Sequence, residues 1–497
     1  MRHPSFEAVI GLEVHCQLLT ASKLFSPESS AFGARPNRHV DPISLGHPGT
    51  LPVMNERMVE YTLRVGLATH CRIRPRSEFA RKHYFYPDLP KGYQISQYDT
   101  PICHDGYIEI SPEDENEGPP VVRRIGITRI HMEEDAGKSI HDQDPYHTLL
   151  DYNRCGVPLI EIVSEPDLRS PREAYLYLQK IRQIVRYLGI CDGNMEEGSL
   201  RCDANVSIRP MGADALGTKT EVKNMNSFRN VERALTYEIE RQIALVEAGG
   251  AVVQETLLWD AGLLETRTMR SKEEAHDYRY FPDPDLVQVV VTEQMLQQVR
   301  AVLPELPEER RARFEGELGL PPYDAALLTE ERPVAHYFET VLEALEGHNV
   351  QDLQVRAKAV SNMVMTHVLR VLNERSMTVE TFPISPERLA ALIGLRLDDE
   401  ISSTGAQALF DLMLEDERPP VVIAQAHQLM QVSDTGALSP LVEQVLADNP
   451  GQVKAYLGGK EGLIGFFIGQ VMRSFPGSPD PKLVRTLLHD ALEARRT

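Results

Sequence analysis

The N-terminal part of the chain contains short apolar or alternating apolar and polar segments that are separated by turn residues. Segments of this length, bounded by Gly, Pro, Asn or Asp, are typical of β-strands. The pattern predicts strands over residues 7–19, 125–132, 159–163, 205–209 and 218–223.

Two segments between these strands have the periodicity of amphipathic helices. Ser170 and Glu173 form a capping box at the start of the first helix, and Gly189 follows its last apolar position. Ser227 starts the second helix, which ends before the glycine pair at 249–250. Strands interspersed with few helices predict an α+β fold built on an antiparallel sheet.

The pattern changes at the proline-rich residues 303–307, beyond which strand signals fade and helical periodicity takes over. Helices are predicted over residues 339–345, 358–372 and 406–414, and a last helix begins at Asp480. We therefore predict an α+β domain, an all-α domain and a small helical tail domain. Their predicted ranges are 1–294, 295–425 and 426–497.

Charge is unevenly distributed along the 497 residues. The whole chain has a formal charge of −21, from 52 Lys+Arg and 73 Asp+Glu. Residues 296–450 are strongly acidic, whereas residues 451–497 hold seven basic and four acidic side chains. Because Lys and Arg contacts to phosphate dominate non-specific nucleic-acid binding, the composition argues against indiscriminate binding and allows a local contact through the terminal segment.

The sequence also limits the compartment and the covalent chemistry that we expect. No apolar run approaches the ~18 residues of a membrane-spanning helix, and the first residues lack the pattern of a secretory or transit peptide. The six cysteines are scattered without a C-x-x-C motif, which favours reduced thiols over disulfides or structural zinc. We therefore expect a soluble, cytoplasmic protein.

Three acidic motifs lie on or beside the predicted strands. Glu13 and His15 are two residues apart, so their side chains project from the same face of a strand. Residues 133–135 are consecutive acids, and Glu161 lies within an apolar strand, where an unpaired carboxylate is costly. Carboxylates and an imidazole suit a divalent metal ion. Ordinary hydrogen-bonded pairs or structural salt bridges are the alternative.

The last two predicted strands carry charges of both signs. Alternation places six polar side chains on shared faces: Arg201, Asp203, Asn205, Lys219, Glu221 and Lys223. In a Mg²⁺–triphosphate site, acids hold the metal ion while Lys and Arg contact phosphate. A solvated polar sheet face is the alternative. We favour a functional site because four such clusters occur in one domain.

Residues 81–97 are rich in aromatic rings, cations and amides. Such a segment can hold a base or a tRNA end by stacking and hydrogen bonding. A rigid aromatic loop fixed by prolines is the alternative interpretation.

Several motifs stand in the order typical of one protein family. They are E-V-H at 13–15, H-P-G-T-L-P at 47–52, Y-F-Y-P-D at 84–88, H-M-E-E-D-A-G-K at 131–138, M-E-E-G-S-L-R at 195–201 and D-Y-R-Y-F-P at 277–282. Together they resemble the GatB family, one of the subunits of the bacterial aspartyl/glutamyl-tRNA amidotransferase. The resemblance covers essentially the whole chain.

The resemblance implies a cradle domain similar to the glutamine synthetase catalytic fold and a tail domain that contacts tRNA. It implies an ATP-dependent carbon–nitrogen ligase with glutamine as amido donor. The side-chain carboxylate of mischarged Asp-tRNA(Asn) or Glu-tRNA(Gln) is phosphorylated, and ammonia then displaces phosphate. Ammonia comes from a partner amidase (glutaminase), and a small third protein completes a heterotrimer. The implied cofactors are ATP and Mg²⁺.

The resemblance also implies roles for individual residues. The family's Mg²⁺ ligands, which serve catalysis, match four residues here: Glu13, His15, Glu134 and Glu161. We expect nucleotide contacts from charged residues further along the chain: Arg201, Lys219, Lys223, Glu196 and Glu221. No zinc is expected, because Ser26 and Ser44 stand where two of the four cysteines of some relatives' zinc site would be.

Two alternatives come from other functional classes. One is a free-standing metal-dependent phosphotransferase or nuclease, and the other is a non-catalytic tRNA-binding scaffold. The chain contains no Gly/Ser-rich amidase segment, so it cannot produce ammonia from glutamine. The ligase hypothesis therefore predicts an amidase partner that co-purifies with this chain.

Overall fold

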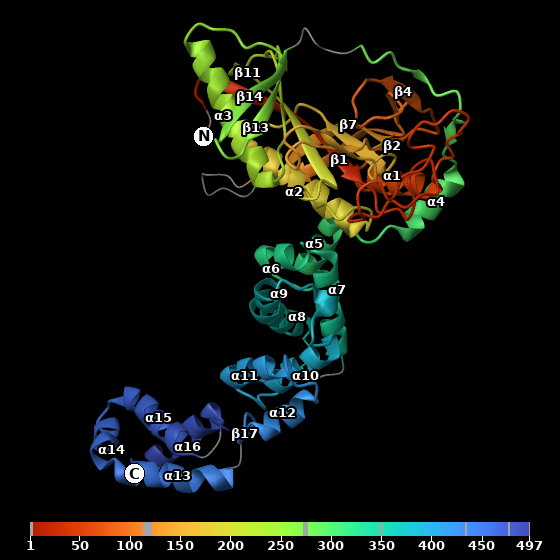
Figure 1. Ribbon diagram of the computed structural model, residues 1–497. Coiled ribbons are helices and arrows are strands. Elements are labelled where there is room, and N and C mark those ends of the chain that lie inside the picture. The colour runs from red at the N-terminus through yellow and green to blue at the C-terminus, as the bar shows by residue number, and fades with distance from the viewer. Residues whose placement is uncertain are drawn as a thin grey trace. The chain divides into compact units, whose positions relative to one another are not determined.

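The computed structural model divides into two compact units, Met1–Pro307 and Glu308–Thr497. Figure 1 shows both units. The structure describes residues 3–112, 122–271, 277–346, 349–350, 352–432, 435–475 and 478–496.

A large sheet organises the first unit (Figure 1). Among the residues that the structure describes, it has nine strands, and all neighbours are antiparallel except β12 and β13. Their order across the sheet is β14 (Glu265–Ser271), β13 (Glu255–Asp260), β12 (Thr220–Lys223), β11 (Leu200–Pro210), β1 (Phe6–Gln17), β10 (Pro158–Ser164), β7 (Arg123–Glu134), β6 (Cys103–Ile110) and β2 (Arg72–Ile73).

The register of the central strands separates an apolar face from a polar one. Glu161 on β10 pairs with His15 on one side and with His131 on the other. Because side chains alternate along a strand, these three residues share a face, and the residues between them point to the opposite face. That opposite face is apolar and buried, with Val14, Ile160 and Met132 among its residues.

Helices cover the apolar face and complete the hydrophobic core of the first unit (Figure 1). They are α1 (Glu56–Ala68), α2 (Pro171–Tyr187), α3 (Phe228–Glu247) and α4 (Glu293–Val302). These four helices do not cover the polar face of the sheet.

The predicted strands and the two predicted helices of this region are confirmed. Ser170 caps α2 by accepting a 3.2 Å hydrogen bond from the backbone N–H of Glu173. Ser227 caps α3 by accepting a 3.1 Å bond from Asn230. The sheet differs from the predicted antiparallel arrangement at one pair, β12 and β13, because α3 forms a crossover between these parallel strands.

A small sheet adjoins the large one beside β7. It consists of β15 (Phe281–Pro282), β4 (Ala80–His83) and β5 (Tyr93–Ser96). The strand β5 is tied to the end of β7, since the side chain of Gln94 donates a 2.7 Å hydrogen bond to the carbonyl oxygen of Glu134. Ser96 at the end of β5 also donates a 3.3 Å hydrogen bond to Glu133, which connects this segment with the polar face.

Three short two-stranded ladders complete the strands of the described residues. They are β16 (Val289–Val290) with β3 (Arg76–Ser77), β8 (Lys138–Ile140) with β9 (Leu149–Asp151), and β17 (Gln431–Val432) with β18 (Ser478–Pro479).

The second unit is helical and contains two hydrophobic cores. The helices of the first core are α5 (Pro307–Gly316), α6 (Pro322–Leu328), α7 (Arg332–Ala344), α8 (Leu353–Met363), α9 (Leu369–Glu374), α10 (Pro386–Leu397), α11 (Ser403–Met413) and α12 (Pro420–Ala426). Those of the second are α13 (Thr435–Asp448), α14 (Pro450–Leu457), α15 (Ile464–Ser474) and α16 (Pro481–Glu493).

The structure is therefore mixed α/β in its N-terminal unit and helical in its C-terminal unit. The helices predicted in the second unit are present, and a π-helical segment at Val364–Val368 joins α8 to α9. The predicted domain boundaries at 294/295 and 425/426 stay predictions. None of the helices described is long and apolar enough to cross a bilayer.

Candidate active site

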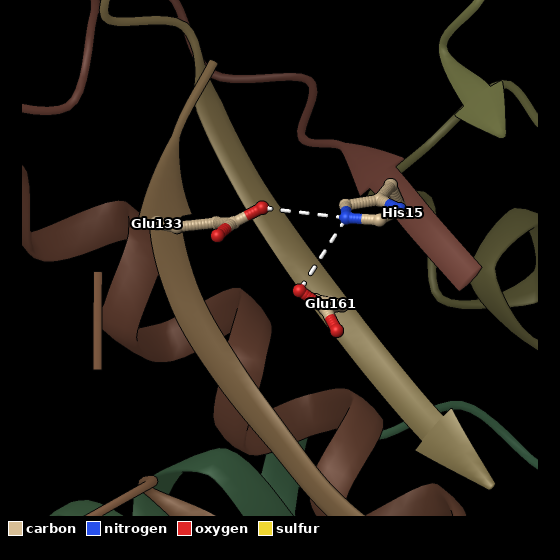
Figure 2. A group of neighbouring side chains, drawn as sticks. All are labelled: His15, Glu133 and Glu161. Carbon is tan, nitrogen blue, oxygen red and sulfur yellow. Dashed lines mark ion pairs between the residues drawn. The ribbon is translucent and has the colours of Figure 1, made fainter. Parts of the chain in front are cut away.

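One histidine and two glutamates meet on the polar face, each from a different strand. Figure 2 shows the carboxylates of Glu133 and Glu161 directed toward the imidazole of His15. The Nε2 atom of His15 lies 3.6 Å from Glu133 Oε1 and 3.4 Å from Glu161 Oε2. His131 adds a second imidazole, with Nε2 3.4 Å from Glu161 Oε2. The ligand atoms of His15, Glu133 and Glu161 lie within 4.8 Å of one another, which allows them to hold a metal ion.

Burial and charge act in opposite directions on this cluster. Burial by itself lowers the pKa of His15, but the carboxylates of Glu161 and Glu133 raise it to about 9. Burial raises the pKa of Glu161, and the neighbouring His131 and His15 lower it well below the ordinary glutamate value. The cluster thus keeps anionic oxygen atoms in a buried position, where a cation is strongly attracted.

The three consecutive acids at the end of β7 have three different sets of partners. Glu133 faces the histidines. Glu134 faces the other way, where its Oε1 accepts hydrogen bonds from Lys91 and, at 2.9 Å, from the backbone of Ile95. Alternation along the strand therefore separates Glu134 from His15 and Glu161, with which the family resemblance grouped it, and brings Glu133 to them.

Asp135, the third of these acids, is buried between two arginines. Arg201 donates a 2.8 Å hydrogen bond to Asp135 Oδ2, and the Nε atom of Arg154 lies 3.6 Å from the same oxygen. Gln17 donates a further bond of 2.7 Å. Burial raises the pKa of Asp135, but Arg201 and Arg154 outweigh this effect and lower it. Arg201, which we expected at the nucleotide, is thus engaged by Asp135.

A second acidic group lies beside the first, on β1, β11 and β12. The carboxylates of Glu13, Asp203 and Glu221 lie within 4.8 Å of one another. Lys223 neutralises part of this charge, with Nζ 2.6 Å from Asp203 Oδ2 and 2.9 Å from Glu221 Oε1. Burial and the neighbouring Glu161 raise the pKa of Glu13. Asn205 donates a 3.0 Å hydrogen bond to Glu13, which orients its carboxylate.

Both acidic groups open into a pocket of about 320 Å³. Strands of the large sheet form its floor, while the small sheet and residues 277–280 supply aromatic and basic side chains. Its lining residues are Glu13, His15, Lys82, Ser96, Gln97, Tyr98, Arg129, His131, Glu161, Asp203, Glu221, Lys223, Tyr278 and Tyr280. Tyr98 and Tyr280 stack with ring centroids 4.0 Å apart.

The structure brings Glu13, His15, Glu161, Glu221 and Lys223 of the expected site residues together in this pocket. Two other expected nucleotide contacts lie elsewhere. Lys219 is exposed ahead of β12, and Glu196 is exposed in the turn that precedes β11.

Sequence reasoning gave no individual role to four residues that the structure places in the cluster or the pocket: Glu133, His131, Arg129 and Lys82. A signal for three of them was present, because residues 129, 131 and 133 alternate along β7 in the same way as Glu13 and His15 do along β1. Lys82 lies on β4, and nothing local in the sequence connects that short strand with the large sheet.

The two serines that led us to expect no zinc lie in a hydrogen-bonded loop. Ser44 donates a 2.6 Å hydrogen bond to Asp41, and both serines are buried. The buried ammonium of Lys23 lies 3.9 Å from Asp41 and donates a 2.7 Å bond to the carbonyl oxygen of His39. The expected absence of zinc stays a prediction.

Comparisons with known proteins agree along the whole chain. A family model described as "GatB/GatE catalytic domain" matches residues 8–297, and one described as "GatB domain" matches residues 337–492. A relative from Salinibacter ruber is 62% identical over 100% of this chain and 99% of its own length. Relatives from Chlorobaculum tepidum and Geobacter sulfurreducens are 54% and 53% identical, over 99% and 98% of this chain and 100% of their own lengths.

All three relatives are named as the B subunit of an aspartyl/glutamyl-tRNA(Asn/Gln) amidotransferase. The matched family domains include every strand of the pocket and most of the helical unit. The chain therefore belongs to the GatB family of aspartyl/glutamyl-tRNA(Asn/Gln) amidotransferase subunits.

Proposed function

We infer that this chain is the subunit of a tRNA-dependent amidotransferase that converts Asp-tRNA(Asn), Glu-tRNA(Gln) or both to the corresponding amides. The observation that carries this inference is the high identity to amidotransferase subunits over the full length of both chains. The pocket supports it, because it combines clustered carboxylates with basic residues. A non-catalytic scaffold would not need this arrangement, and a free-standing phosphotransferase is not favoured by the relatives' names.

Formation of an amide from a carboxylate requires that oxide, a poor leaving group, be converted to a better one. A carboxylate cannot release oxide, so ATP first phosphorylates one of its oxygens, and ammonia then displaces phosphate from the acyl phosphate. The positive charge of Lys223, at one end of the pocket, is suited to the phosphates of the nucleotide. We propose Glu13 and Glu221 as neighbours of the same nucleotide, since both acids lie in this part of the pocket.

The residues present fit a divalent cation such as Mg²⁺. His15, Glu133 and Glu161 offer three ligand atoms in one place, and Glu13 lines the same pocket. When bound, such a cation would neutralise phosphate charge and polarise the phosphorus–oxygen bonds. We propose Glu133 as a ligand in place of Glu134, because Lys91 and the backbone of Ile95 occupy the Glu134 carboxylate.

We further propose the assembly and the fold relationship that the family suggests. The relatives are named as one subunit of a larger enzyme, which implies a complex. In this complex, a partner amidase would supply ammonia and a small third protein would complete a heterotrimer. The mainly antiparallel sheet with helices on one face is compatible with a cradle similar to the glutamine synthetase catalytic fold.

The test of the function is an amidation assay of the reconstituted complex. The chain would be purified with its amidase partner and supplied with glutamine, ATP and each mischarged tRNA in turn. We expect formation of Asn-tRNA(Asn) or Gln-tRNA(Gln) that depends on both ATP and this chain. Glutamine hydrolysis without any amidated tRNA from either substrate would contradict the proposal.

The tail domain gives a further prediction. Residues 435–496 contain a separate hydrophobic core, and the basic segment of the chain begins within them, at residue 451. Deleting residues 426–497 should raise the KM for charged tRNA and leave the KM for ATP unchanged, because phosphate contacts act on tRNA affinity. Steady-state kinetics with each substrate varied measures both values. An unchanged KM for tRNA would exclude the tail as a tRNA contact.

A further inference from the structure

Two basic residues in the pocket have no acidic partner among the described residues. Lys82 projects from β4, and its Nζ atom lies 4.9 Å from the ring centroid of Tyr278 without any ion pair. Arg129 projects from β7, and its Nε atom is buried with no hydrogen-bond partner. The other basic groups around the site differ, since Lys91, Arg201 and Lys223 each form an ion pair with a carboxylate.

These two residues lie at the opposite side of the pocket from Lys223. Strands β11, β1 and β10 separate β12, which carries Lys223, from β7, which carries Arg129. With strands ~4.8 Å apart, this separation is about 19 Å between the two strands. The pocket therefore has a basic group at each side and carboxylates between them.

Lys82 is held in its charged form. Burial lowers the pKa of Lys82, but Glu133 and Glu161 outweigh this and raise it above the ordinary lysine value. These carboxylates act on Lys82 through space, since among the described residues its ammonium contacts the rings of Tyr84 and Tyr278 and forms no ion pair. The ammonium of Lys82 is thus kept charged without a contact ion pair, which leaves it available to a bound anion.

The reaction brings two kinds of anion to the pocket, and they differ in whether they are bound together with a divalent cation. A nucleotide triphosphate is bound together with a divalent cation, for which the cluster of His15, Glu133 and Glu161 is suited. The carboxylate of the aminoacyl group brings no cation of its own. Arg and Lys are the usual partners of a carboxylate, because a guanidinium can donate two parallel hydrogen bonds to its oxygens.

We propose that Lys82 and Arg129 bind the side-chain carboxylate of the aspartyl or glutamyl group on the charged tRNA. This inference rests on the proposed function and assigns the acyl substrate to one side of the pocket. The acyl group lies beside the cation cluster, so its carboxylate is within reach of the terminal phosphate of the nucleotide.

The proposed position of the substrate carboxylate is consistent with the bonds that form and break in the two steps of the reaction. One carboxylate oxygen attacks the γ-phosphorus of ATP, the bond to the β-phosphate oxygen breaks, and ADP leaves. Ammonia then attacks the side-chain carbonyl carbon of the acyl phosphate. The carbon–oxygen bond to phosphate breaks, phosphate leaves, and the nitrogen loses a proton to solvent. Lys82 and Arg129 hold the carboxylate in place before the first step, and they are binding residues in this scheme.

The test is discrimination between the acid and its amide. Complete complexes with Lys82→Met or Arg129→Met would be titrated with Glu-tRNA(Gln) and, separately, with the product Gln-tRNA(Gln). The wild-type complex should bind the acid more tightly, and each variant should lose roughly 10- to 100-fold of this preference, as expected for a hydrogen bond to a charged group. Affinity for ATP with Mg²⁺, measured with a fluorescent nucleotide, should not change.

Two further variants control for charge and folding. Arg124→Met removes an exposed arginine from the same strand, where it pairs with Glu109, and should keep the wild-type preference. Lys82→Arg keeps the positive charge and should preserve most of the discrimination. Because Trp259 is the only tryptophan and is buried in the same unit, its fluorescence shows whether each variant is folded.

The outcomes separate this inference from the proposed function. If both variants lost affinity for ATP but kept the preference for the acid over the amide, Lys82 and Arg129 would be assigned to the triphosphate. This result would overturn the proposal. A wild-type complex that binds acid and amide equally would also overturn it. A wild-type complex that amidates neither tRNA contradicts the proposed function, whereas normal amidation with unaltered preference in both variants contradicts only the carboxylate subsite.

Discussion

Replacing Glu161 by glutamine is expected to lower ATP-dependent amidation on the order of a thousandfold while glutamine hydrolysis by the partner amidase continues. Glu161 is the central residue of the cluster, since it contacts both His15 and His131. Glutamine keeps the size of the side chain but removes the negative charge that attracts a divalent cation. Amidation and glutaminase activity would be measured side by side on the reconstituted complex.

The same assay decides which acid of β7 belongs to the cluster. Glu133→Gln should raise the Mg²⁺ concentration needed for half-maximal amidation, and Glu134→Gln should not, because its carboxylate faces Lys91. Glu165→Gln is the matched control, since Glu165 is exposed just beyond β10. If Glu134→Gln alone raised the Mg²⁺ requirement, the ligand set expected from the sequence would be right and the one proposed from the structure would be wrong.

Asp135→Ala is expected to destabilise the N-terminal unit by about 3 kcal/mol. The substitution removes a buried carboxylate, 4% exposed, and leaves the half-buried side chains of Arg201 and Arg154 without their shared partner. Gln17 loses its acceptor at the same time. Urea unfolding followed by the fluorescence of Trp259, which is buried in this unit, measures the change in the free energy of unfolding.

A control for this prediction is Asp214→Ala, which removes a carboxylate at an exposed position of the same unit. It should leave the unfolding midpoint unchanged, because surface substitutions of this kind have small effects. An Asp135→Ala transition that coincides with the wild-type transition would show that the two arginines find other partners.

Much of the fold was predictable because local patterns determine it. The capping serines at 170 and 227 marked both helix starts correctly, since an N-cap is a contact within one turn of the chain. Alternation placed Glu13 and His15 on the polar face for the same reason. The crossover that makes β12 and β13 parallel was not predictable, because it depends on where α3 packs.

The structure groups the candidate site residues differently from the sequence in part, and the differences have physical causes. The predicted strand at 125–132 stops before the acids, whereas β7 continues to Glu134. Alternation was therefore not applied to Glu133 and Glu134, and their opposite orientations were missed. The nucleotide contacts were expected from residue type and strand alternation, neither of which reveals a partner that is distant in the sequence. Arg201 shows the weakness of this approach, because a partner distant in sequence, Asp135, occupies its guanidinium.

The position of β1 has a consequence for how the protein is made. This strand precedes the other described strands of the large sheet, whereas its partner β11 follows much later, since Asn205 lies 192 residues beyond Glu13. At about 5–20 residues per second, this delay amounts to roughly 10–40 s of synthesis. The edge of this central strand that pairs with β11 stays unpaired during that time, which makes it prone to aggregation. The cluster of His15, Glu133 and Glu161 can form only after β10, which carries Glu161, has been synthesised.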